Sequence, residues 1–119
     1  MDTDNNGFYL GLSLAGISPG VYDLTAKGFS HLRDKEGSIV LSDGVNNVDF
    51  SNSETDYLLA GDVNGTNGDN LVNSIDIAIE VIKLDETAGV EREDLNQDTI
   101  VNSIDLAMTI KNLDLWGDN

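Results

Sequence analysis

Oxygen-bearing side chains recur at alternate positions of an acidic segment in the last third of the chain, and this spacing suits a divalent cation. With Asp94 as position 1, side-chain oxygens fall at positions 1, 3, 5, 9 and 12, and position 7 offers a backbone carbonyl. This is the ligand pattern of a twelve-residue EF-hand-type calcium loop. Two positions depart from it, since position 6 is Thr99 instead of glycine and position 12 is Asp105 instead of glutamate. The predicted calcium ligands of this second loop (residues 94–105) are Asp94, Asn96, Asp98, Ile100, Asn102 and Asp105.

An earlier acidic segment carries the same oxygen spacing in a less regular form. Counting back from Asp76 at position 12 puts Gly65 at position 1, and glycine has no side-chain oxygen. Taking Asp62 as position 1 implies an insertion of three residues, and Asn67 is then an alternative to Asn64 at position 3. The predicted calcium ligands of this first loop (residues 62–76) are Asp62, Asn64, Asp69, Leu71, Asn73 and Asp76. We therefore expect two calcium ions per chain, because without them the six loop carboxylates should repel one another and oppose folding.

An internal repeat supplies the elements that position both loops. Residues 71–85 align with residues 100–114 at an offset of 29, and eight of the fifteen aligned positions are identical. Each copy runs from an Asp/Asn-rich loop into apolar residues at helical spacing, which predicts one helix after each loop. The faces predicted to be buried carry Ile77, Val81 and Leu84 in the first helix and Leu106, Ile110 and Leu113 in the second. Ile100 and Val101 are expected to form a short β-bridge between the paired loops.

A second apolar stripe runs along both predicted helices, and the core does not require it. It comprises Ile75, Ala78, Ile79 and Ile82 on the first helix and Ile104, Ala107, Met108 and Lys111 at the equivalent positions of the second. An exposed apolar stripe marks a surface that binds a partner. The alternative is that the preceding β-rich segment covers one of the two stripes.

The composition narrows the range of partners. The 119 residues include 22 acidic and 6 basic side chains, which gives a formal net charge of −16. Nucleic acids and anionic membrane surfaces require clustered lysine and arginine, so the charge argues against both. The absence of cysteine and the single histidine, His31, exclude disulfides, thiol catalysis and multi-histidine metal sites. No apolar run is long enough for a membrane-spanning helix, so no membrane insertion is expected.

The first half of the chain has the alternating pattern of β-structure. About four short antiparallel strands are expected, at residues 8–14, 21–26, 38–41 and 48–50, and the last two should form a hairpin around Asp43 and Gly44. Residues 1–57 can make only a small core, so they form either a separate small module or the end of a larger β-sandwich. The expected fold class is therefore α+β, with a small β-sandwich-like segment at residues 1–57 and a helical domain at residues 58–119.

The loops and helices together resemble the duplicated segments of dockerins, which are calcium-binding modules of secreted bacterial and some archaeal proteins. The resemblance covers residues 58–119 and rests on residues 58–64, 69–76 and 94–105, where loop, helix and duplication follow in the same order. It implies an all-α fold of two calcium loop–helix units (F-hands) that binds a cohesin domain of a scaffoldin or cell-surface protein. Residues 1–57 resemble the Ig-like or X-module-like segment that often precedes a dockerin.

The dockerin resemblance also implies roles for individual residues. Positions 10 and 11 of each loop and the following helical turns would contact the cohesin, which assigns Ser74, Ile75, Ser103 and Ile104 to recognition. The full partner surface would then be Ser74, Ile75, Ala78, Ile79, Ile82, Ser103, Ile104, Ala107, Met108 and Lys111. The resemblance further implies an extracellular or cell-surface location, as part of a larger secreted protein such as a polysaccharide-degrading component of a cellulosome.

Two functions from different classes are consistent with these features. The favoured one is a non-catalytic module that docks onto a cohesin, and the alternative is an EF-hand protein that buffers or senses calcium. Sensor pairs have a helix before each loop and a bidentate glutamate at position 12, whereas turn-rich sequence precedes the first loop here. An enzyme is least favoured, because acidic pairs such as Glu91 and Glu93 lack a glycosidase-sized scaffold and His31 is expected in a surface turn.

Overall fold

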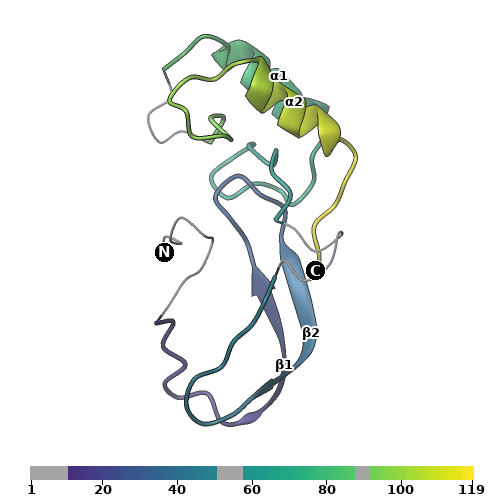
Figure 1. Cartoon of the computed structure of the whole chain (residues 1–119). Helices are drawn as coiled ribbons and strands as arrows, with labels where there is room; N and C mark the ends of the chain where they lie inside the picture. Colours follow the sequence, from purple (N-terminus) through teal and green to yellow (C-terminus); the bar gives the residue numbers. More distant parts are fainter. Residues whose placement is uncertain (1–10, 51–57, 88–91) are drawn as a thin grey trace.

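The computed structural model describes residues 11–50, 58–87 and 92–119, which form a mixed α+β fold of two strands and two helices. Strand β1 spans Gly20–Ala26, strand β2 spans Asp34–Leu41, helix α1 spans Ser74–Lys83 and helix α2 spans Ser103–Lys111. The strands form a long ribbon, and the two helices lie side by side at the other end of the molecule, beyond the loops (Figure 1). None of the helices in these ranges has the length and apolar character needed to cross a membrane.

The ribbon is an antiparallel pair in which Gly20 lies opposite Leu41 and Ala26 lies opposite Asp34. The alternation of residues 21–26 correctly predicts β1, and the predicted strand 38–41 is the second half of β2. The register shifts where Ser38 adopts a positive φ of 59° and donates its N–H to the Asp23 carboxylate at 3.0 Å. This bulge increases the twist of the ribbon.

The described part of the first half contains two strands, not the four that were expected. Residues 48–50 form no strand, and β2 pairs with β1 instead of with them. The Asn46 side chain accepts the N–H of Ser42 at 2.9 Å and donates to the Ser42 carbonyl at 3.0 Å, so it occupies backbone groups that a hairpin would need. Residues 11–14 of the expected first strand also form no strand, and Phe8 and Leu10 lie outside the described residues.

Both helices begin at an asparagine that caps the helix and an aspartate that closes a capping box. The Asn73 side chain accepts the N–H of Ile75 at 2.7 Å, and the Asp76 carboxylate accepts the N–H of Asn73 at 2.9 Å. Asn102 and Asp105 make the same two bonds at the start of α2. These side chains satisfy backbone groups that a helix start otherwise leaves free. The repeated Asn-Ser-Ile-Asp sequence therefore fixes where each helix begins.

The core is small and lies between the loops and the helices. Ala60, Val63 and Leu95 form its buried cluster, and Ile79 and Met108 pack against that cluster. Ile79 and Met108, which were expected to lie on the partner surface, are therefore partly buried in the core.

The helix faces that were predicted to be buried are largely exposed. Of the six side chains in that prediction, Val81, Leu84, Ile110 and Leu113 are exposed, and Ile77 and Leu106 are half-buried. The reason is that the Asp76 and Asp105 carboxylates bond to the loop backbone, which turns their side of each helix inward. The fully buried helical side chains are Asp76, Glu80, Asp105 and Thr109.

Each loop pairs with the segment that follows the helix of the other repeat. The carbonyl of Val101 in the second loop accepts the N–H of Asp85 at 2.8 Å, and the carbonyl of Val72 in the first loop accepts the N–H of Asp114 at 2.8 Å. Both valines are fully buried. The expected β-bridge between the loops at Ile100 and Val101 is therefore wrong, because these backbone groups are used by the segments that leave the helices.

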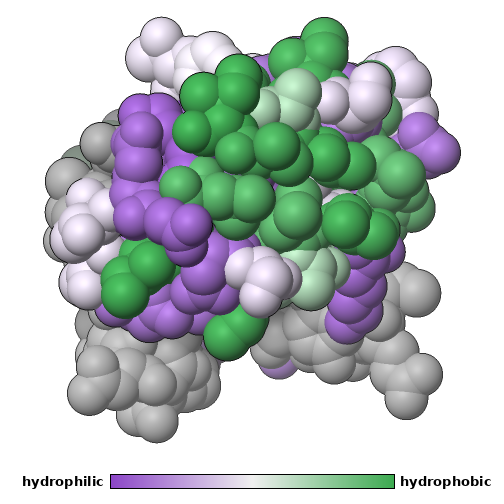
Figure 2. Space-filling view, turned by 90° about the horizontal axis from the view of Figure 1, so that it is seen from above, coloured by the Kyte–Doolittle hydropathy of each residue, from purple (hydrophilic) through white to green (hydrophobic). Residues whose placement is uncertain are grey.

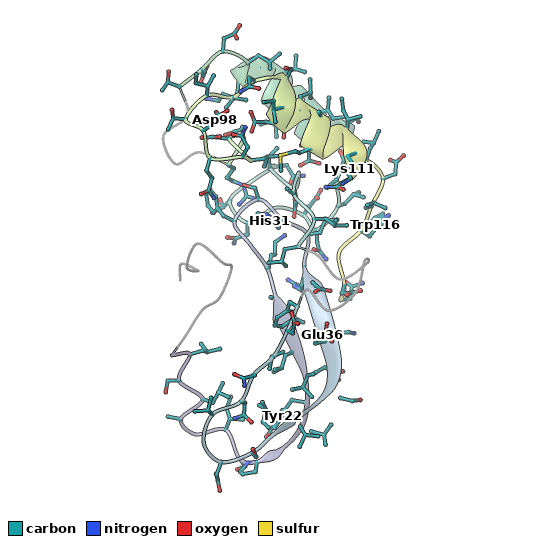
Figure 3. The ribbon with its side chains drawn as sticks, viewed as in Figure 1. Tyr22, His31, Glu36, Asp98, Lys111 and Trp116 are labelled. Atoms are coloured by element: carbon teal, nitrogen blue, oxygen red, sulfur yellow. The ribbon has the colours of Figure 1, made fainter. Side chains whose placement is uncertain are left out.

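The segment between the strands joins the ribbon to the loops. Leu32 donates its N–H to the Leu59 carbonyl at 2.7 Å, and His31 pairs with Ala60 as a short β-bridge. His31 is therefore half-buried where the ribbon meets the loops (Figure 3), and it does not lie in a surface turn.

The last residues pack back onto the start of β2 and onto the first loop. Gly117 donates its N–H to the Asn70 carbonyl at 3.0 Å, and Asp118 donates to the Arg33 carbonyl at 2.8 Å. A Cβ at position 117 would overlap both the Asn70 side chain and the Arg33 backbone, so glycine is required there. The two halves of the chain are thus connected at two places.

Candidate functional site

Carboxylate oxygens hold the backbone of the second loop in place. Asp94, at position 1, accepts the N–H groups of Asp98 at 3.1 Å and Thr99 at 2.9 Å. Asp105, at position 12, accepts N–H groups from positions 2, 3 and 9 at 2.8, 3.2 and 2.8 Å. Thr99, at position 6, has a φ of 76°, which is a left-handed conformation that favours glycine.

The first loop makes the same bonds once three extra residues are allowed for. Asp62 accepts the N–H groups of Asp69 and Asn70 at 3.0 Å each, seven and eight residues further along the chain. The corresponding partners of Asp94 lie four and five residues further along. Asp76 accepts three N–H groups at 2.9, 3.1 and 2.9 Å, as its counterpart in the second loop does. The two loops therefore share one backbone arrangement, and the insertion lies between Asp62 and Asp69.

A glycine turn accommodates this insertion. Gly68 donates its N–H to the Asn64 carbonyl at 3.0 Å and has a φ of 70°. A Cβ on Gly68 would overlap the Asp62 carboxylate, whereas Gly65, with a φ of 58°, faces open space. The Asn64 N–H bonds to the position-12 carboxylate, as position 3 of the second loop does, so Asn64 is the structural counterpart of position 3 and Asn67 lies within the insertion.

Three residues of the second loop lie around the Asp98 carboxylate. The Asp98 carboxylate accepts the side-chain amides of Asn96 at 2.9 Å and Asn102 at 3.4 Å, and the Asn102 amide lies 3.3 Å from the Ile100 carbonyl. The hydrogen bond from Asn96, together with the Ile100 N–H, lowers the pKa of Asp98 below its ordinary value. Positions 3, 7 and 9 thus each bond to position 5, and all four positions can offer hard oxygen atoms. Such a donor set fits Ca²⁺, which prefers oxygen ligands.

Carboxylates alone do not make a metal site in either loop. Among the residues that the structure describes, no three acidic or histidine side chains converge on one point. A cation would therefore also use asparagine side chains and backbone carbonyls. The first loop repeats the local geometry at position 5, because Asp69 accepts the N–H of Leu71 at 3.1 Å, just as Asp98 accepts that of Ile100 at 3.0 Å.

Two basic side chains from outside the first loop contact it, and neither was identified from the sequence. Lys27 Nζ lies 2.5 Å from the Asp62 carboxylate and 2.7 Å from the His31 carbonyl. Arg92 donates to three backbone carbonyls between residues 62 and 66, at 2.5, 3.2 and 3.1 Å, and lies 4.7 Å from the centre of the Phe29 ring. Lys27 and Asp62 are 35 residues apart in the sequence, so no local spacing indicates this contact.

The outer side of the helix pair is apolar and exposed. Ile82 is 77% exposed, Ile75 is 56% exposed and Ile104 is 55% exposed. Figure 2 shows apolar side chains in one continuous area on this end of the molecule. We call the set the apolar helix face, and it comprises Ile75, Ala78, Val81, Ile82, Ile104, Ala107 and Ile110. Ser74, Ser103 and Lys111 of the expected partner surface are also exposed.

The described part of the β-rich segment covers neither stripe. The ribbon meets the loops on the side opposite the helices and extends away from them (Figure 1). The alternative, that the β-rich segment covers one of the two stripes, therefore does not hold for the described residues. Ile75 and Ile82 of the first repeat and Ile104 of the second are accessible.

A buried hydrogen bond joins the helices at equivalent positions of the repeat. Thr109 donates its hydroxyl to the Glu80 carboxylate, and both side chains are fully buried. Burial raises the pKa of Glu80 to about 7, and the nearby carboxylates of Asp105 and Asp76 add to this effect. The second oxygen of Glu80 has no hydrogen-bond partner among the described residues. The two repeats therefore meet at a contact that is equivalent in position but not in chemistry.

Comparisons with known proteins identify the fold. No protein-family model and no curated protein matches the sequence. A chain in the crystal structure of a type II cohesin–X-dockerin complex from Acetivibrio cellulolyticus, a C-terminal interface mutant, matches with a TM-score of 0.62 and 15% identity, over 87% of this chain and 68% of that chain. The N-terminal interface mutant of that complex matches with a TM-score of 0.59 and 16% identity, over 85% of this chain and 67% of the other. The chain therefore shares the fold of a chain in these complexes.

Proposed function

We propose that this chain is a non-catalytic docking module that binds a cohesin domain through the apolar helix face. The observation that carries the proposal is the exposure of that face on two helices whose starts are each held by an EF-hand-type loop. The resemblance of residues 58–119 to dockerins supports a cohesin as the partner. The fold likeness to cohesin–X-dockerin complexes supports the same class of partner.

Calcium would offset the negative charge of the loop carboxylates and would tie the ligands of each loop to one ion. Asp76 and Asp105 bind the loop backbone and also cap the helices, so order in the loops sets the orientation of the apolar helix face. The ligands that we propose are Asp62, Asn64, Asp69, Leu71, Asn73 and Asp76 for one ion, and Asp94, Asn96, Asp98, Ile100, Asn102 and Asp105 for the other.

The two repeats should not contribute equally to binding. Ile82 and Lys111 occupy equivalent positions, and both are exposed. A lysine makes an apolar interface less favourable unless a carboxylate of the partner meets it. We therefore propose that the first helix leads the interaction, with Ser74 and Ile75 at its centre, and that Ser103 and Ile104 contribute less.

The test is a calorimetric titration of the full chain with a panel of cohesin domains that includes type II members, at saturating calcium. We expect Ile75→Asp to cost about 2–4 kcal/mol of binding free energy, as for a buried apolar anchor, and Ile104→Asp to cost less. The double variant and excess chelator should both abolish binding. Val45→Asp is the matched control, because Val45 is 91% exposed and lies in the turn region after β2, away from the helices.

Equal losses from the two single variants would contradict the leading role of the first helix and would support two interchangeable binding modes. Full binding by the double variant would contradict the apolar helix face as the docking surface. Circular dichroism of each variant checks that the helices remain folded.

A calcium sensor or buffer of the EF-hand type is less well supported. Residues 58–61, which lead into the first loop, form no helix, whereas sensor pairs have a helix on that side. As a docking module, the chain would act outside the cell, where it would tether a secreted protein, such as a polysaccharide-degrading one, to a scaffoldin or to the cell surface.

A further inference from the structure

The first loop has a positive charge in contact with its position-1 carboxylate, and the second loop has none. All six basic side chains of the protein lie within the described residues. One of them, Lys27, makes an ion pair with Asp62 at 2.5 Å. No ion pair joins a basic side chain to Asp94, Asp98 or Asp105 in the described ranges. The two loops therefore share a backbone arrangement but have different electrostatic surroundings.

We propose that Lys27 is an internal counter-cation of the first loop, and that it competes with Ca²⁺ for Asp62. This inference rests on the proposed calcium binding. Asp62 is fully buried, and a buried carboxylate is costly unless a cation or several hydrogen bonds compensate it. The Lys27 ammonium provides that compensation from the end of β1, where the His31 carbonyl also accepts a hydrogen bond from it.

The position of Lys27 allows its ammonium to leave Asp62 when Ca²⁺ binds there. Its side chain is 20% exposed, so the ammonium can reach water when Asp62 binds another cation. The lysine stem is flexible and its head is a compact, strongly hydrated charge. Both oxygens of Asp62 also accept backbone N–H groups, so the carboxylate stays in place when the ammonium leaves.

Three consequences follow from this arrangement. The first loop should bind calcium more weakly than the second, because the ion must displace or tolerate an ammonium. The first loop should also depend less on calcium for its folded shape. The ribbon, through Lys27, should influence the calcium affinity of a loop that lies in the other half of the chain.

The test uses the full chain in an Asp98→Ala background, which disables the second loop at an exposed position and leaves the first loop to be titrated alone. In this background Lys27→Met should raise the affinity for Ca²⁺ about tenfold, since a unit charge near a divalent ion is removed. The same change should lower the melting temperature in excess chelator. Lys27→Arg, which keeps the charge, should retain the weak affinity.

Lys35→Met is the matched control for net charge, because Lys35 lies on the same ribbon and its Nζ bonds to the Asn119 carbonyl instead of to a loop. It should change the calcium affinity less than twofold. Loss of both calcium affinity and stability in Lys27→Met would overturn the proposal and make Lys27 a structural support only. An unchanged affinity would also overturn it. After either of these outcomes, two calcium sites in the otherwise unmodified chain would leave the proposed function intact. Absence of calcium binding to that chain would contradict both the role of Lys27 and the proposed function.

Discussion

The two loops have the same backbone hydrogen bonds, but they are stabilised by different surroundings. Asp62 and Asp94 each accept two N–H groups, and Asp76 and Asp105 each accept three. Around the first loop, Lys27 neutralises a carboxylate and Arg92 binds three carbonyls. The second loop lacks such contacts in the described part of the chain and relies on its own side chains.

This difference shows how a duplicated unit can diverge without losing its geometry. The first loop carries an insertion and two basic contacts, and the second loop keeps the standard length with Thr99 in a strained conformation. A longer loop loses more conformational entropy on folding, and outside contacts can offset that loss. We therefore expect the first loop to depend on its neighbours and the second loop to depend on its ligands.

The largest expected effect is that of the position-12 carboxylates. Asp105→Ala should lower the free energy of unfolding by about 3–5 kcal/mol, because one buried and two part-buried N–H groups lose their acceptor. Asp76→Ala should cost less, about 2–3 kcal/mol, since Arg92 still holds the first loop. Each change should also remove one calcium site. Denaturant unfolding and calorimetric stoichiometry measure both effects, and equal losses of stability would show that Arg92 does not protect the first loop.

The insertion of the first loop can be tested with a pair of glycines. Gly68→Ala places a methyl group on the Asp62 carboxylate and should lower the free energy of unfolding by about 2–3 kcal/mol, as overpacking and backbone strain add. Gly65→Ala adds only the strain of a positive φ, about 1 kcal/mol, because no atom lies near its Cβ. The difference between them measures how closely the insertion packs on Asp62, and similar melting temperatures would mean that this packing is loose.

The smallest expected effect concerns position 6 of the second loop. Thr99 is β-branched and has a φ of 76°, so Thr99→Gly should raise the free energy of unfolding by about 1 kcal/mol. Asn70→Gly, at position 6 of the first loop, should give no gain, because Asn tolerates this conformation and its side chain accepts the N–H of Arg33 at 2.7 Å. Thermal unfolding of both variants checks this, and destabilisation by Thr99→Gly would contradict the strain assigned to Thr99.

Features that depend on nearby residues were accessible from the sequence. The repeat predicted both helices, and the caps at Asn73 and Asn102 follow from residues within three positions. The sequence implied an insertion of three residues in the first loop. The structure agrees, because the first backbone partner of Asp62 lies seven residues along the chain and that of Asp94 lies four. Strand β1 was found from its alternation alone. That these loops bind metal stays a prediction.

Features that depend on distant residues were missed or wrong. The buried helix face was misassigned because hydrophobic spacing favours Val81 and Ile110, whereas the loop carboxylates orient the helices differently. The strand partner of β2 was wrong because Asn46 blocks the nearer hairpin. The contacts of Lys27 and Arg92 join segments at least 26 residues apart, and no local pattern encodes them.

The exchange of backbone bonds between the repeats has a consequence for how the chain folds. The Val72 carbonyl bonds to Asp114, which follows α2, so this pairing needs the end of the second repeat. The Val101 carbonyl bonds to Asp85, which follows α1. Neither repeat can satisfy its own backbone groups, because each loop valine bonds to the other repeat. In an excised single repeat that valine would have no backbone partner. The helical half should therefore fold in one all-or-none transition without a half-folded intermediate, and its rate should be limited by closing the long loop between residue 72 and residue 114.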